Sequence, residues 1–150
     1  MRRIQVVLAS IIIAAAGLTQ AHADGGSASR SSRLAPFQQL IDEEKYQAAI
    51  DQLQAALKDD PDDADLLNLT AYSQRKLQRF DEALANYLKA LQIEPDHRGA
   101  NEYLGELYLQ MGQLDKAQER LQVLDKACFF GCEEYDDLKE AIELYRTQNQ

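Results

Sequence analysis

Tryptophan is absent from this sequence, and cysteine, histidine and proline are scarce. The 150 residues include two Cys, two His and three Pro. Two Cys and two His are too few for a zinc fold with several ligand sets or for a small domain stabilised by many disulfides. The seven Gly residues are scattered, which excludes a glycine-rich phosphate loop. The motifs HExxH, GxSxG and CxxC are missing too, so we expect no enzyme activity, no catalytic residue, no resident metal and no cofactor.

Positive charge is also in short supply. Lys and Arg together number 16 against 25 Asp and Glu, which gives a net charge of −9 at pH 7. An acidic protein repels phosphate groups, so general binding to nucleic acid or to anionic membranes is disfavoured. Apolar residues make up 45% and charged residues 27% of the chain, which is typical of a folded protein of one domain.

The one long apolar run of the chain lies at its N-terminus. A basic start at 1–3 precedes an apolar run over 4–18, and Ala-His-Ala at 21–23 matches a small-x-small cleavage site. This layout is typical of a secretory signal peptide over residues 1–23. The run is shorter than the ~20 residues that span a bilayer, and no Cys follows it to carry a lipid. We expect cleavage after Ala23, no stable membrane anchor, and a periplasmic or secreted protein. Removal of two arginines then changes the net charge from −9 to −11.

A short leader separates this segment from the rest of the chain. Residues 24–35 are rich in Gly and Ser and predict a flexible leader. Within this leader, only Leu34 is expected to pack against the first helix. Residues 36–150 form the expected folded domain.

Most of that domain repeats with a period of 34 residues. The sequences KYQAA, RFDEA and QLDKA begin at Lys45, Arg79 and Gln113, and Pro61 and Pro95 have the same spacing. A fixed period of this length with a closing proline resembles the tetratricopeptide repeat family. The resemblance implies an all-α, right-handed α-solenoid of about three helix pairs, with repeats at about 30–63, 64–97 and 98–131.

Apolar residues recur at three- and four-residue steps, which predicts helices and no strands. We expect the helices at about 36–44, 47–58, 64–77, 81–93, 98–111, 115–127 and 133–147. Small residues at regular places let antiparallel helices approach closely: Ala71, Ala83, Ala90, Gly105 and Ala117. Asp62 or Asp63, and Asp96, are expected to cap the helices that follow them.

The last predicted helix, 133–147, is expected to cap the stack. One of its faces is apolar and carries Tyr135, Leu138, Ala141, Ile142 and Tyr145. The other face is charged, as the exposed end of a repeat protein requires.

Cys128 and Cys132 flank Phe129-Phe130-Gly131 before this helix. After export, two Cys favour a disulfide that fixes the angle at which the cap leaves the last repeat. The alternative is a redox-active or copper-binding pair, since two thiols can share a soft metal.

Two other features have a simple structural interpretation and a functional one. His97 follows Pro95-Asp96 at an inter-repeat turn, where we expect a solvated turn residue or a helix-start residue rather than a proton carrier or ligand. Five aspartates crowd the turn around Pro61 and suggest calcium. They lack the Gly and the distal Glu of a calcium loop, which favours a solvated acidic turn.

In the tetratricopeptide repeat family, the first helix of each pair lines a concave groove that holds a peptide or a partner helix. Position by position, the resemblance implies the following groove residues here: Gln38, Ile41, Asp65, Asn68, Tyr72, Arg75, Glu102, Glu106 and Leu109. The family members that grip a C-terminal carboxylate use several Lys and Asn, whereas Arg75 is the one cation in this set. A basic or mixed apolar segment is therefore the expected partner. The simpler alternative is that these residues form a polar face with no ligand.

Three functions follow from these features. The first is a non-enzymatic scaffold or adaptor that binds a partner protein in envelope assembly, secretion or maturation. The alternative is a small redox- or copper-handling protein that uses Cys128 and Cys132. The third is a homo-oligomer in which either the acidic face or Phe129 and Phe130 pack against another copy.

Overall fold

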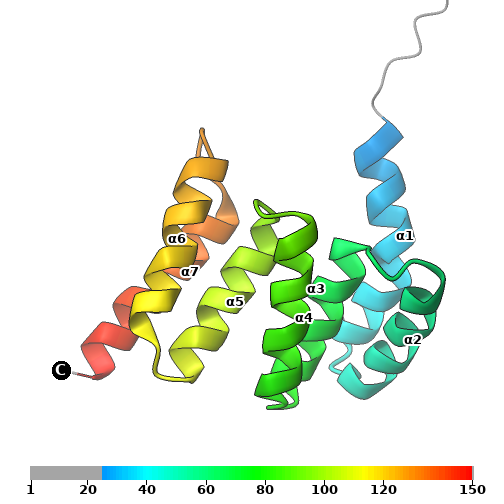
Figure 1. The fold of residues 1–150 in the computed structure, drawn as a ribbon, viewed down its shortest axis with the longest axis horizontal. Helices are drawn as coiled ribbons and strands as arrows, with labels where there is room; N and C mark the ends of the chain where they lie inside the picture. The colour runs from blue at the N-terminus through cyan, green and yellow to red at the C-terminus, as the bar shows by residue number, and fades with distance from the viewer. Residues whose placement is uncertain (1–24, 150) are drawn as a thin grey trace, which may run out of the picture.

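Seven helices and the short turns between them make up residues 25–149, which are the residues that this computed structural model describes. The helices are α1 (Gly25–Asp42), α2 (Tyr46–Asp59), α3 (Ala64–Lys76), α4 (Phe80–Ile93), α5 (Arg98–Gln110), α6 (Leu114–Ala127) and α7 (Glu133–Gln148). Figure 1 shows them as a stack that runs from α1 at one end to α6 and α7 at the other. Because this part of the chain contains no strand, the prediction of an all-α stack of helix pairs is confirmed. The predicted signal peptide and its cleavage site lie outside the described residues.

Helices α2 to α7 begin and end within one residue of the predicted bounds. The Asp63 carboxylate accepts a hydrogen bond of 3.1 Å from the Leu66 N–H, as predicted for the start of α3. The prediction for Asp96 is wrong. The second residue after proline caps the helix in both turns, and in the second turn this residue is His97, whose Nδ1 accepts from the Ala100 N–H at 3.1 Å.

Helix α1 is longer than predicted. The expectation of a flexible leader over 24–35 is wrong for residues 25–35, which form the first part of α1. The first helix was expected over 36–44, but Pro36 lies inside α1. Arg30 and Arg33 hold the extension by ion pairs with carboxylates at the start of α3. These contacts join residues far apart in the sequence, so no local pattern reveals them.

The turn inside each helix pair has the same backbone conformation. The φ angle is 57° at Glu44, 62° at Gln78 and 74° at Gly112, three positions that are 34 residues apart. In each turn the next residue donates its N–H to the carbonyl five residues earlier, at 2.7 to 2.9 Å, as in a Schellman motif. Only Gly112 is a residue type that favours positive φ. The packing of the helix pairs therefore imposes this turn at Glu44 and Gln78.

Small residues let neighbouring helices approach, as predicted. Four of them are fully buried: Ala71, Ala83, Ala90 and Ala117. At Gly105, a Cβ atom would lie 2.6 Å from the side chain of Leu138, so the glycine allows close packing of α5 and α7. The main apolar cluster extends from α3 to α7, and a smaller one joins α1, α2 and α3. Leu34 packs against the smaller cluster.

Helix α7 closes the C-terminal end of the stack. Leu138 and Ile142 are buried, and Tyr135, Ala141 and Tyr145 pack against the main cluster, as predicted for a cap. Among residues 25–149, none of the helices combines the length and hydrophobicity that a bilayer crossing requires.

Candidate binding groove

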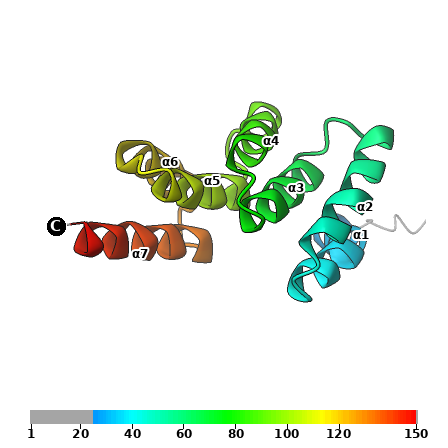
Figure 2. The same cartoon turned by 90° about the horizontal axis from the view of Figure 1, so that it is seen from below.

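Helices α1, α3, α5 and α7 form a continuous series, because each contacts the next. In Figure 2, α4 and α6 lie on one side of the stack and α7 lies on the other. The sequence predicts the groove on α1, α3 and α5. We use the name groove for the surface of these three helices together with α7, which continues the series.

A pocket of about 280 Å³ opens in the groove between α1, α3 and α5. Its aromatic walls are Tyr46, Tyr72 and Tyr103, and we call it the tyrosine pocket. The rings of Tyr72 and Tyr103 lie 4.8 Å apart between centroids. The Lys76 Nζ lies 5.9 Å from the Tyr46 ring and 5.8 Å from the Tyr72 ring. Aromatic walls with a polar rim suit side chains of mixed apolar and polar character.

Arg75 connects the tyrosine pocket to α5. Its guanidinium lies 5.3 Å from the Tyr72 ring and 5.7 Å from the Tyr103 ring. Its Nη2 is 2.7 Å from the Glu106 carboxylate. Burial by itself would lower the pKa of Arg75, but the neighbouring Tyr87 and Glu106 raise this pKa above its ordinary value. The charge of Arg75 is thus used inside the protein and is not free to hold a ligand's carboxylate.

At the N-terminal end of the groove, a buried carboxylate has cationic partners. Asp65 is 7% exposed, and its Oδ2 is 2.6 Å from Arg30 Nε and 3.1 Å from Arg33 Nη2. His97 Nε2 is 3.1 Å from Asp65 Oδ1. Since Nδ1 of this histidine accepts the capping hydrogen bond, Nε2 donates to Asp65. Burial alone would raise the pKa of Asp65, but the bond from His97 and the charge of Arg30 hold it below its ordinary value. We call this group the N-terminal junction.

At the C-terminal end, a buried carboxylate lacks such partners. Glu102 is 6% exposed, and no hydrogen bond or ion pair from residues 25–149 reaches its carboxylate. Burial, followed by the negative charges of Glu106, Asp137 and Glu134, raises the pKa of Glu102 to about 8, although Arg75 opposes the shift. We call the four carboxylates the C-terminal acidic cluster.

The structure separates the residues that the sequence grouped in the groove. Gln38, Ile41 and Tyr72 line the tyrosine pocket, while the charged residues belong to the two ends described above. Asn68 is buried, and its Oδ1 has no hydrogen-bond partner among the described residues. Leu109 is a core residue rather than a groove residue, because it packs in the main apolar cluster and is 8% exposed.

Sequence reasoning missed several residues of the groove. Tyr103 lies two residues before Gly105, and its aromatic ring was the available signal. Glu134 and Asp137 were expected only near the start of α7 and on its charged face, which points to solvent. Their spacing of three residues places them on one face of that helix. Nothing in the local sequence connects Arg30 with Asp65.

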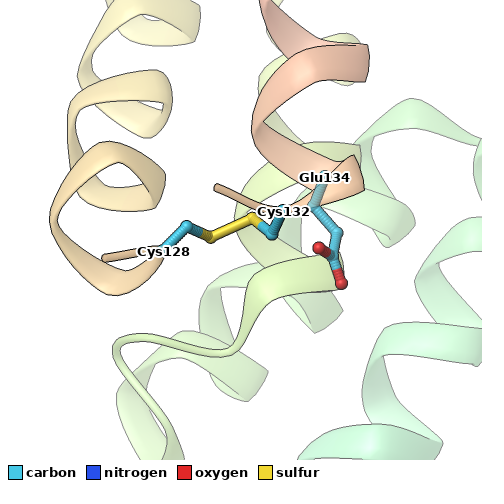
Figure 3. Close-up of side chains that lie close together, drawn as sticks. All are labelled: Cys128, Cys132 and Glu134. Carbon is cyan, nitrogen blue, oxygen red and sulfur yellow. A yellow bond between two sulfur atoms is a disulfide. The ribbon is translucent and has the colours of Figure 1, made fainter. Parts of the chain in front are cut away.

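Cys128 and Cys132 form the predicted disulfide, with a Cα–Cα distance of 5.6 Å, so neither is free. Gly131 between them has a φ of 84°, a conformation that glycine adopts at little cost. Figure 3 shows Glu134 beside the disulfide, at the start of α7. Its carboxylate and the two sulfurs lie within 4.8 Å of one another. While the disulfide is intact, the sulfurs offer no thiolate to copper, so the redox or copper alternative requires its reduction.

The turn at this disulfide also carries two exposed aromatic side chains. Phe129 is 87% and Phe130 is 96% exposed, and their rings meet edge to face with centroids 5.0 Å apart. Self-association through them stays a prediction.

Two of the five aspartates around Pro61 are engaged by arginine. Asp63 pairs with Arg33, and Asp65 pairs with Arg30. These contacts favour the structural interpretation of the acidic turn over a calcium site, because two of its carboxylates are already neutralised.

Solved structures show the same fold in several other proteins. The Sgt2 tetratricopeptide repeat domain of Aspergillus fumigatus has 21% identity and a TM-score of 0.69, and the match covers 80% of this chain and 79% of that one. PcrH in complex with the chaperone binding region of PopD has 16% identity and a TM-score of 0.67, covering 83% and 96%. The Yersinia enterocolitica type III secretion chaperone SycD, in complex with a peptide of the translocator YopD, has 15% identity and a TM-score of 0.66, covering 85% and 99%.

A comparison of the sequence with family models agrees with the fold seen in these structures. No curated protein matches this chain. Two models described as tetratricopeptide repeat match residues 37–98 and 74–142. Together they include the second and third helix pairs and most of the first. The chain therefore belongs to the tetratricopeptide repeat family.

Proposed function

We propose that this protein is a non-enzymatic adaptor that binds a segment of a partner protein in its groove. The observation that carries the proposal is the tyrosine pocket, an open pocket with three aromatic walls in the groove. Repeat stacks supply extended concave surfaces of this kind. The complexes of PcrH and SycD, in which a partner segment is bound to the same fold, support the proposal.

The charge of the groove favours a basic or mixed apolar segment. Arg75 is paired with Glu106, and Arg30 with Asp65, whereas Glu102 has no cationic partner among the described residues. A peptide rich in acidic groups would meet net repulsion, while a basic one would complement the surface.

We also propose that the protein acts outside the cytoplasm, in the periplasm or beyond, in assembly, secretion or maturation of envelope proteins. The signal-like sequence over residues 1–23 supports export. The disulfide between Cys128 and Cys132 is consistent with it, because such bonds persist in oxidising compartments.

Site-specific photo-crosslinking in cells tests the adaptor function. A photoreactive p-benzoylphenylalanine replaces Gln38, an exposed residue at the rim of the tyrosine pocket, or Gln92, an exposed residue of α4. We expect a defined crosslinked product from position 38, its loss on adding Tyr72→Ala or Tyr103→Ala, and none from position 92. Equal products from both positions, or none from position 38, would contradict groove binding.

A further inference from the structure

The groove contains one buried acidic group that the protein itself leaves uncompensated. Glu102 is as buried as Asp65, but Asp65 has Arg30, Arg33 and His97 as partners. Burying a carboxylate without a cation or hydrogen-bond donor costs free energy. A cation from outside the chain would lower that cost.

The charges that act on Glu102 come from three helices. They belong to Arg75 of α3, to Glu106 on its own helix, and to Glu134 and Asp137 of α7. Helices α3 and α7 are the two neighbours of α5 in the groove. Gly105 lets Leu138 of α7 pack closely against α5, and α7 carries two of the carboxylates that act on Glu102.

We propose that the C-terminal acidic cluster binds the side chain of an arginine or lysine in the partner segment, and that Glu102 is the specificity-determining residue for that charge. This inference rests on the proposed function and specifies one contact of it. A hollow of about 450 Å³ opens at the start of α5, and Glu134 is the one residue of the cluster that lines it, together with Arg30, Glu94, Asp96, His97, Arg98 and Gly99.

A cationic side chain fits the cluster better than a metal ion does. Among the described residues, only Cys128, Cys132 and Glu134 have three ligand atoms within 4.8 Å of one another. The four carboxylates of the cluster are thus too dispersed to share one small ion, since calcium typically takes ~6–8 oxygens at about 2.3–2.6 Å. A guanidinium or ammonium group carries several donors that can reach separate carboxylates.

Ligand binding in this cluster is coupled to a proton. Because the pKa of Glu102 is about 8 in the free protein, its carboxyl group is mostly protonated at about pH 7. A bound cation favours the carboxylate form, so Glu102 releases its proton to solvent when the cation binds. Binding therefore strengthens as the pH rises toward the pKa of Glu102.

Selection from a phage-displayed library of random dodecapeptides tests the inference. The purified wild-type protein, Glu102→Gln and the matched control Glu140→Gln, which changes an exposed residue of α7, are screened in parallel. Because Glu102 is mostly neutral in the free protein, the Glu102→Gln variant should fold normally, and circular dichroism checks that it does. We expect wild type and the control to enrich peptides with Arg or Lys at one fixed position. The Glu102→Gln variant should enrich peptides without that preference.

Calorimetry on one enriched peptide, and on its copy with citrulline in place of the basic residue, completes the test. Citrulline should weaken binding at least about tenfold for wild type and for Glu140→Gln, and about twofold or less for Glu102→Gln. In buffers of different ionisation enthalpy, wild type should release up to about one proton at neutral pH, and Glu102→Gln none. Asp137→Asn, a milder change at an exposed position, should give an intermediate loss.

The outcomes separate the inference from the proposed function. Enriched peptides without a basic position, or an equal affinity for the citrulline copy, would overturn the inference and leave groove binding intact. Failure to enrich any peptide would overturn both. Calcium chloride alone binding to wild type but not to Glu102→Gln would show that the cluster is a metal site, and would overturn the side chain as its occupant.

Discussion

Asp65 and Glu102 are both buried carboxylates of groove helices, but the groups around them carry opposite charges. Asp65 lies beside Arg30 and His97, and its pKa is below the ordinary value. The charges nearest Glu102 are mostly those of other carboxylates, two of them on α7, and its pKa is raised. The first group holds α1 in place. In the second group Glu106 pairs with Arg75, but Glu102 has no hydrogen bond or ion pair among the described residues, and this is why we assign Glu102 to a ligand.

The comparison of Asp65 with Glu102 also shows which features recur along the repeats and which do not. The backbone of the turns recurs every 34 residues, but the charges do not, because the residue 34 positions before Glu102 is Asn68 and the residue 34 positions after Asp65 is Gly99. The charge at each end of the groove depends on the helix that packs there, which is α1 at the N-terminal end and α7 at the C-terminal end.

The largest effect is expected from Leu138→Ala, which removes the main apolar contact between α7 and α5. Leu138 is fully buried and lies against Gly105. We expect a loss of about 2–4 kcal/mol in the free energy of unfolding, measured by urea denaturation, because the substitution leaves a cavity. The control is Leu144→Ala on the same helix, which is exposed and should change stability by less than about 0.5 kcal/mol. A loss equal to that of the control would contradict the packing of α7 as a cap.

The double variant Cys128→Ser/Cys132→Ser removes the disulfide at the start of α7. Closing so short a loop contributes about 2 kcal/mol at most, so we expect a modest loss of thermal stability with helicity retained. Reduction of the wild-type protein should give the same shift. Crosslinking from position 38 should be unchanged. Its loss in the double variant, with helicity intact, would instead favour the redox or copper function.

At the N-terminal junction, Asp65→Asn removes the charge that Arg30 and Arg33 share. We expect a loss of about 1–2 kcal/mol near neutral pH. Since the pKa of Asp65 is lowered in the folded protein, its contribution is present above the unfolded pKa and is lost as the pH falls through the folded pKa. The difference from wild type should therefore disappear in acid. Asp62→Asn, at an exposed carboxylate of the same turn, is the control and should have little effect at any pH.

The smallest and opposite effect is expected at the C-terminal acidic cluster. The pKa of Glu102 is raised in the folded protein, so the folded state holds its proton longer than the unfolded one, and this residue lowers stability as the pH rises from the unfolded pKa to about 8. Glu102→Gln should therefore stabilise the free protein by about 1 kcal/mol at alkaline pH and leave stability in acid unchanged. Equal destabilisation by this substitution at both pH values would mean that Glu102 has a partner in the free protein. Glu140→Gln is the control.

The accuracy with which the sequence predicts the fold differs from helix to helix. Periodic apolar residues fixed α2 to α7 to within one residue, because each of these patterns is local and directly reflects the face that a helix buries. The same reasoning failed at α1. Its extension is stabilised by Arg30 and Arg33, whose partners lie two helices away. Asp96 was expected as a cap because Asp is a common capping residue, whereas the turn places His97 at that position.

By itself, the sequence determined helices α2 to α7, the 34-residue period and the small residues at helix contacts, and it favoured a disulfide between Cys128 and Cys132. All of these depend on residues close together in the chain or on a repeated spacing. Only the tertiary structure decided which carboxylates of the groove are neutralised, that three tyrosines form a pocket, and that α7 brings its acidic residues to Glu102. The physical reason is that charge and pocket shape depend on side chains from different helices, and a sequence pattern does not record how those helices meet.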